Sequence, residues 1–60
     1  MPQSVIIYDK CPQFTAIFSD GQTLTNQQVT FKQLCDYIDK IGIDKQNIVI
    51  YNRFMQLSYL

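Results

Sequence analysis

The sequence predicts a small α+β domain in which a mostly antiparallel sheet packs on one helix, in the order β-β-β-α-β with a possible fifth strand. Three observations predict this class. Short apolar stretches separated by turn residues occupy the first half of the chain, a segment with helical periodicity covers about residues 30–41, and a second apolar stretch follows at 48–51. A chain of 60 residues is expected to form a single domain, residues 1–60.

The first strand is expected within SVIIY, residues 4–8. Four consecutive apolar residues, mostly β-branched, are typical of a strand that is buried on both faces. The DKCPQ sequence that follows is expected to be a loop. Pro12 lacks a backbone donor and favours an extended conformation at Cys11.

A hairpin is predicted over FTAIFSDGQTLT, residues 14–25. Asp20-Gly21 is typical of a type I′ turn, in which both central residues need a positive φ. If these two residues alone form the loop, Ile17 pairs with Leu24 and their side chains lie together on one sheet face. The opposite face then carries Phe14, Ala16 and Phe18.

The helix has the clearest sequence signals. Its apolar side chains fall on one arc at helical spacing, and they are Phe31, Leu34, Cys35, Ile38 and Ile41. Thr30 as N-cap with Gln33 makes a capping box, and Gly42 suits the left-handed position after the last turn. A second possible start at Thr25 with Gln28 ranks lower, because it turns Val29 away from the apolar arc.

IVIY, residues 48–51, predicts an interior strand, parallel to its neighbour through the helical crossover. A single strand reaching Leu60 would be unusually long. We therefore expect a bend near Asn52 and Arg53, followed by a shorter strand around 55–59.

A helix of about eleven residues is roughly 16 Å long and covers one face of a small sheet. The predicted sheet, however, carries apolar side chains on both faces. The C-terminal tail could cover the second face, a second copy could pair with it in a homodimer, or a different protein could bind there. Aromatic residues and Met are enriched at interface cores, which makes these residues the candidate partner contacts: Tyr51, Phe54, Met55, Leu57 and Tyr59.

Catalytic chemistry is not expected. The chain has no His, so Cys11 lacks the histidine base that would help it form a thiolate. Asp36 and Asp39 could hold a cation, but Lys32 at helical spacing indicates a solvated, ion-paired surface. We therefore predict no enzyme activity, no catalytic residue, no metal site and no cofactor.

Nucleic-acid binding is the second hypothesis. Aromatic side chains on a sheet can stack single-stranded bases, and the candidates are Tyr8, Phe14, Phe18 and Tyr51. Five basic residues balance five acidic ones, however, so attraction to phosphate is weak. A protein partner or self-association is favoured over nucleic acid.

The sequence thus predicts a small non-enzymatic protein-binding module, an inhibitor or adaptor that occludes a larger protein. One setting that suits such a chain is a phage or mobile-element gene directed against a host defence enzyme. A structural homodimer with no further ligand is a third hypothesis. No targeting segment or membrane span is visible, so a cytoplasmic location is expected, in which Cys11 and Cys35 are reduced.

Overall fold

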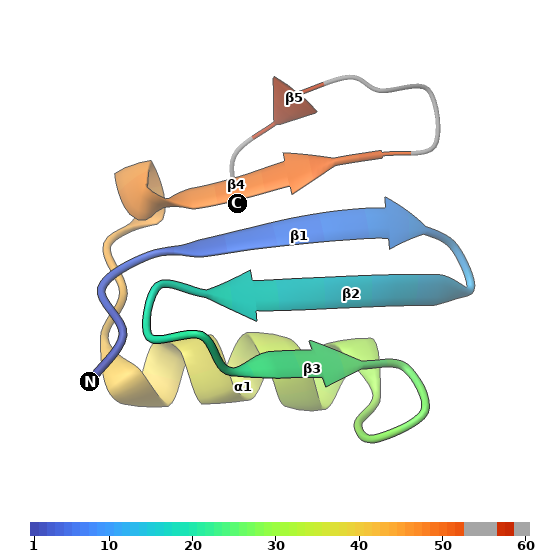
Figure 1. Cartoon of the computed structure of the whole chain (residues 1–60), viewed down its shortest axis with the longest axis horizontal. Helices are drawn as coiled ribbons and strands as arrows, with labels where there is room; N and C mark the ends of the chain where they lie inside the picture. The colour runs from blue at the N-terminus through green and yellow to red at the C-terminus, as the bar shows by residue number, and fades with distance from the viewer. Residues whose placement is uncertain (53–56, 59–60) are drawn as a thin grey trace.

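A computed structural model describes residues 1–52 and 57–58 of the chain. Figure 1 shows one layer of strands with a helix packed behind it. The elements are β1 (Val5–Lys10), β2 (Gln13–Phe18), β3 (Thr23–Thr25), α1 (Phe31–Ile41), the 3₁₀ turn η1 (Lys45–Asn47), β4 (Ile48–Tyr51) and β5 (Leu57–Ser58). The predicted α+β class, element order and helix are confirmed.

The described strands form one sheet in the order β3-β2-β1-β4-β5 (Figure 1). Strands β1 and β2, β2 and β3, and β4 and β5 are antiparallel, whereas β1 and β4 are parallel. A parallel neighbour requires a crossover, and the chain makes it through α1. This confirms the predicted parallel pairing of the 48–51 strand, and it places β1 in the middle of the sheet with β4 between β1 and β5.

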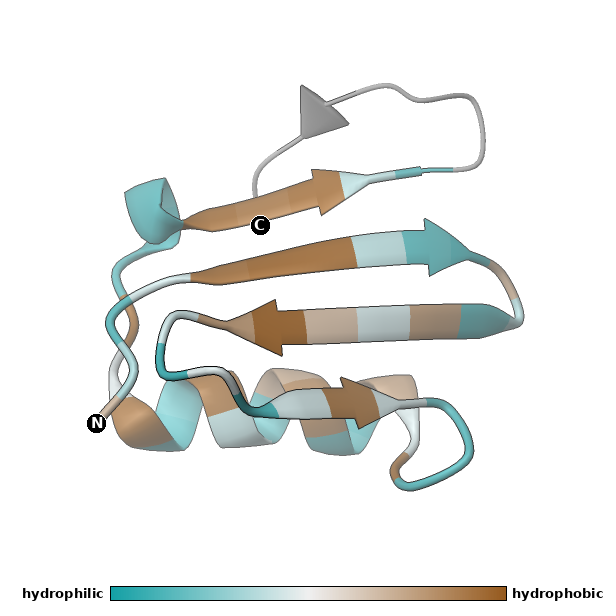
Figure 2. Cartoon of the chain, viewed as in Figure 1, coloured by the Kyte–Doolittle hydropathy of each residue, from teal (hydrophilic) through white to brown (hydrophobic). Residues whose placement is uncertain are grey.

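The core lies between the sheet and α1. It consists of side chains from every large element, namely Val5, Ile7, Phe14, Ala16, Phe18, Leu34, Ile38, Ile43, Ile48 and Ile50. In Figure 2 the apolar segments of β1 and β4 run side by side through the middle of the sheet. These core residues all lie between Val5 and Ile50.

The first strand is buried on one face, and the prediction of burial on both faces is wrong. Val5 and Ile7 are enclosed, whereas Ile6 and Tyr8 keep 40% and 39% of their surface exposed. Alternate side chains of a strand point to opposite faces, and α1 covers one of them. The apolar run therefore exposes every second residue.

The register of the hairpin also differs from the prediction. Ile17 pairs with Thr23, while Leu24 pairs with Ala16. The Gly21 N–H donates to the Phe18 carbonyl (3.0 Å), and Gly21 has φ +93°. The loop thus has one residue more than a type I′ hairpin, with glycine in the left-handed position. The shift brings Leu24 to the α1 side, where it packs against the core.

Both predicted signals at the ends of α1 are present. The Gln33 N–H donates to Thr30 Oγ1 (3.1 Å) and the Thr30 N–H donates to Gln33 Oε1 (2.8 Å), which completes the capping box. Gly42 has φ +78°, and the Ile43 N–H donates to the Ile38 carbonyl (3.4 Å) as in a Schellman motif.

The lower-ranked start at Thr25 forms a single turn that does not continue into α1. The Thr25 N–H donates to Gln28 Oε1 (3.0 Å), and the Thr25 carbonyl accepts from the N–H groups of Gln28 and Val29 (3.0 and 3.1 Å). The sequence signal at Thr25 was real, but it marks the end of β3.

Replacing Thr30 by alanine is expected to lower the free energy of unfolding by about 1 kcal/mol, because the N-cap loses its side-chain acceptor. In a domain of this size the melting temperature should fall by roughly 4–8 °C. Thermal denaturation followed by circular dichroism measures the change. Thr30→Ser keeps the hydroxyl and should melt close to the unmodified protein, and equal melting of all three would contradict a stabilising cap.

The C-terminal strand is confirmed at Leu57–Ser58, within the range expected for it. Its backbone pairs with β4, with Tyr51 opposite Leu57 and Ile50 opposite Ser58. The expected bend at Arg53 lies outside the described residues. Strand β5 therefore adds a strand to the sheet beside β4.

Candidate protein-binding face

The candidate site is the sheet face opposite α1, which we call the open face. Strand alternation and the pairing register assign to it Ile6, Tyr8, Lys10, Gln13, Thr15, Ile17, Thr23, Thr25, Val49 and Tyr51. No described element packs over these side chains, and each is half-buried or exposed. The apolar surface anticipated on a second sheet face is therefore present.

An apolar strip crosses the open face over β1, β2 and β4. Ile6 lies at its centre, paired with Ile17 on one side and Val49 on the other. Ile6 and Ile17 are each 40% exposed. Thr15, Thr23 and Thr25 lie beyond the strip on the β2–β3 side, so its apolar character is strongest over the parallel pair.

Two tyrosines continue the strip. The rings of Tyr8 and Tyr51 stack with their centroids 5.5 Å apart and an interplanar angle of 15°. They also pair in the β1–β4 register. Stacking holds both rings in place, which lowers the entropy that binding a partner would cost.

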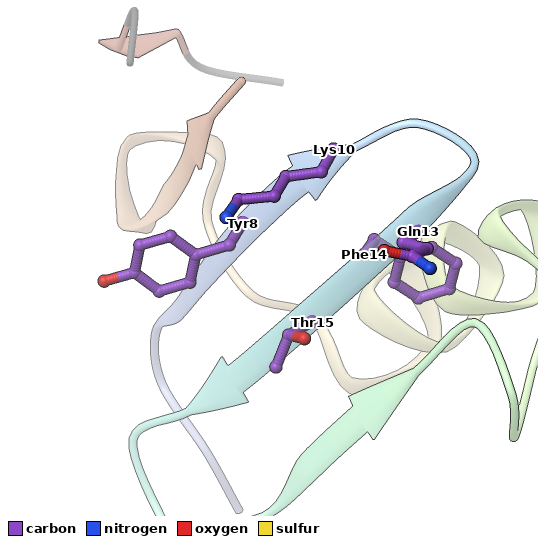
Figure 3. A pocket seen from close by; sticks show the side chains of 5 residues that line it. All are labelled: Tyr8, Lys10, Gln13, Phe14 and Thr15. Atoms are coloured by element: carbon purple, nitrogen blue, oxygen red, sulfur yellow. The ribbon is translucent and has the colours of Figure 1, made fainter. Parts of the chain in front are cut away.

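The strip ends at a pocket lined by both polar and aromatic side chains. Figure 3 shows Tyr8, Lys10 and Thr15 projecting from the paired ends of β1 and β2, where a hollow of about 310 Å³ is lined by these residues with Gln13 and Phe14. Lys10 is the charged residue of the open face among the described residues. The open face thus combines an apolar strip with a cation at one end.

Of the five predicted partner contacts, the structure places Tyr51 on the open face, half-buried beside Tyr8. Leu57 is described by its backbone, which pairs with Tyr51 in the β4–β5 ladder. Phe54, Met55 and Tyr59 lie outside the described residues. Their role stays a prediction.

Sequence reasoning missed Ile6 and Lys10, and it named Tyr8 only as a candidate for stacking bases. The signal was present, because strand alternation puts all three on one face once β1 is known to reach Lys10. Because the residues from Val5 to Tyr8 are all apolar, the sequence does not indicate which face of this strand is buried.

The β3 edge offers little room for an added strand. Its register directs the N–H and C=O groups of Thr23 and Thr25 outward. Both groups of Thr25 are bonded within the turn that follows β3. Strand addition at β3 would therefore rest on Thr23 alone, and the open face is the stronger candidate site.

The two cysteines are free thiols in different surroundings. Cys11 is exposed, and its N–H donates to Asp9 Oδ1 (3.0 Å). Cys35 is half-buried on α1, where burial raises the pKa of its thiol, and the negative charges of Asp36 and Asp39 raise it further. Neither thiol has an imidazole beside it to act as a base, because the chain contains no histidine.

Cys11 is expected to be alkylated by iodoacetamide faster than Cys35 at pH 8, because Cys11 is accessible and the raised pKa of Cys35 reduces its thiolate fraction. The rate at Cys35 should rise as the pH approaches its raised pKa. Timed alkylation with mass spectrometry of peptides measures both rates. Equal rates in the folded protein would contradict this assignment, and equal rates in urea provide the control.

The remaining sequence candidates are placed as follows. Lys32 Nζ lies 3.2 Å from Asp36 Oδ2 on the exposed side of α1. Among the described residues, no group of three or more His, Cys, Asp or Glu side chains could hold a metal ion. Phe14 and Phe18 belong to the core, so only Tyr8 and Tyr51 of the four proposed base-stacking aromatics reach the open face.

Within the described part of the chain, no helix has the length and apolar character needed to cross a membrane. Searches of protein-family models, of curated proteins and of solved structures found no match to this chain.

Proposed function

We propose that the protein is a small non-enzymatic binding module whose open face docks on a larger protein. The observation that carries the proposal is the apolar strip of Ile6, Ile17 and Val49, which continues into the stacked pair Tyr8–Tyr51. Aromatic and aliphatic side chains at the centre of a patch with a polar rim are typical of interface cores.

The β1–β4 pair strengthens the proposal. Sheets made only of parallel strands are covered on both faces almost without exception, and this mixed sheet contains one such parallel pair. Here α1 covers one face, and the other face of the same two strands carries Ile6, Tyr8, Val49 and Tyr51. A bound protein would supply the missing layer.

Single-stranded nucleic acid is the second candidate, supported by the Tyr8–Tyr51 stack beside Lys10. Its weakness is charge, since one lysine on the open face neutralises few phosphates. Binding to nucleic acid would weaken steeply with rising salt, whereas apolar docking would change little.

The biological setting that we propose is occlusion of a larger enzyme in the cytoplasm, for example a host defence enzyme targeted by a phage or mobile element. A module with a single apolar face can block a surface without chemistry of its own. Self-association through the same face, as a homodimer, is the competing assembly.

Site-specific photocrosslinking in the native host tests the proposal. A photoreactive p-benzoylphenylalanine at Tyr51 samples the open face, and the same residue at exposed Lys40 on α1 is the matched control. We expect a discrete protein adduct from position 51 that is absent from position 40. Equal adducts from both positions, or none from position 51, would overturn the proposal.

The adduct also separates the alternatives. A partner of a different sequence supports the proposed docking, an adduct of twice the chain mass indicates a homodimer, and adducts lost on nuclease treatment indicate nucleic acid. Repeating the reaction with a chain that ends at Asn52 tests the tail. Adducts that persist assign binding to the open face itself, and adducts that vanish from a folded truncated chain assign it to the tail.

A further inference from the structure

The shape and charge of the open face restrict what can lie on it. This inference rests on the proposed function and concerns the chemistry of the partner. From the described residues we infer that the partner docks an amphipathic α-helix along β1 and β4 and places an acidic side chain at Lys10.

The width of the apolar strip suits a helix. It spans the three neighbouring strands β2, β1 and β4, whose axes are about 4.8 Å apart, so it is roughly 10 Å wide. An α-helix with its side chains is about 10–12 Å across. From Ile6 to Lys10 the strip runs about 13 Å along β1, which two to three helical turns would cover.

The covered face of the same sheet provides a precedent. There Leu34 and Ile38 of the 11-residue α1 belong to one core cluster with the buried side chains of β1, β2 and β4. A second helix on the open face would give the parallel pair the helix-sheet-helix layering found in mostly parallel sheets.

The positive charge of Lys10 favours an acidic residue at one end of the partner helix. Lys10 lines the pocket together with Thr15, and its side chain extends toward Tyr8 (Figure 3). The open face carries no Asp among its described residues. A carboxylate of the partner would therefore meet a cation without an internal competitor.

A second copy of the chain fits this surface less well. Its one described α-helix, α1, already buries its apolar residues Leu34 and Ile38. Its open face would present another Lys10 and no described carboxylate. A partner with an exposed amphipathic helix satisfies both the strip and the cation.

Two displayed peptide libraries test the inference against the full-length chain. One presents stapled 16-residue helices with apolar residues at i, i+3, i+4 and i+7, and the other presents β-hairpins of equal length, with all remaining positions randomised in both. Selections are run on the unmodified protein and on Lys10→Glu, and binders are retained if Ile17→Lys abolishes their binding.

We expect helices to be enriched, with Asp or Glu at one end of the apolar stripe for the unmodified protein and Lys or Arg there for Lys10→Glu. A helix selected on the unmodified protein should bind Lys10→Glu about tenfold more weakly, and Lys10→Gln about threefold more weakly. Circular dichroism of the variants confirms that they remain folded.

If the selected helices carry the same charged residues for the unmodified protein and for Lys10→Glu, the inferred acidic contact at Lys10 is wrong. If only hairpins are enriched, the inferred helical partner is wrong. Either result leaves docking on the open face intact. If neither library yields a binder sensitive to Ile17→Lys, the helical occupant is overturned, and the photocrosslinking result then decides separately whether the open face binds protein.

Discussion

Replacing Leu34 by alanine is expected to remove most of the stability of the domain. Leu34 has no exposed surface and lies on α1 at the centre of the core cluster. Truncating a buried leucine costs about 2–5 kcal/mol through lost burial and the cavity left behind. A domain of 60 residues has a free energy of unfolding of roughly 3–9 kcal/mol. The melting temperature should therefore fall by at least about 10 °C.

Two further variants make the Leu34 experiment specific. Leu34→Met keeps the volume and should cost less than about 1.5 kcal/mol. Lys40→Ala changes an exposed position of α1 and should stay within about 0.5 kcal/mol of the unmodified protein. Urea denaturation followed at 222 nm measures all three. A Leu34→Ala protein as stable as Lys40→Ala would show that α1 does not close the core.

The parts of the fold that could be predicted from sequence are those set by neighbouring residues. The capping box of Thr30 with Gln33, and the left-handed Gly42, each depend on bonds within a few positions of the chain. Such signals can be recognised without knowing the tertiary structure. The start and end of α1 were therefore predicted correctly.

The hairpin register could not be predicted in this way. Asp20-Gly21 fits both a two-residue loop and the longer loop observed, in which Gly21 has φ +93°. The choice between the two loops depends on which face of the sheet Leu24 occupies. The longer loop packs it with the core beside Ala16, whereas the shorter one would have left it on the open face.

The candidate site was predictable in outline and incomplete in detail. The existence of a second apolar face followed from the strand pattern, and Tyr51, a predicted partner contact, lies on that face. Ile6 and Tyr8 could not be distinguished from their buried neighbours, because a run of apolar residues does not reveal which side a helix covers. That assignment required the packing of α1 against Val5 and Ile7.

Replacing Ile17 by lysine is expected to abolish docking while leaving the fold intact. Ile17 is 40% exposed and pairs with Ile6 and Thr23, so lysine can extend into solvent in the unbound protein. In a complex its ammonium would be buried against the apolar strip without a partner. Central interface residues cost 2 kcal/mol or more when altered, so adduct formation at Tyr51 should fall by at least about thirtyfold.

The yield of the adduct from a photoreactive residue at Tyr51, measured with and without Ile17→Lys, gives this ratio directly. Gln27→Lys adds the same charge on the exposed turn between β3 and α1, and its yield should equal that of the parent. Melting temperatures of the two lysine variants should agree within a few degrees, which separates lost docking from lost folding. An undiminished adduct yield in a folded Ile17→Lys protein would contradict this prediction, because it would show that the partner crosslinked at Tyr51 does not contact Ile6 and Ile17. The binding surface would then lie beyond the apolar strip, toward the β4 edge.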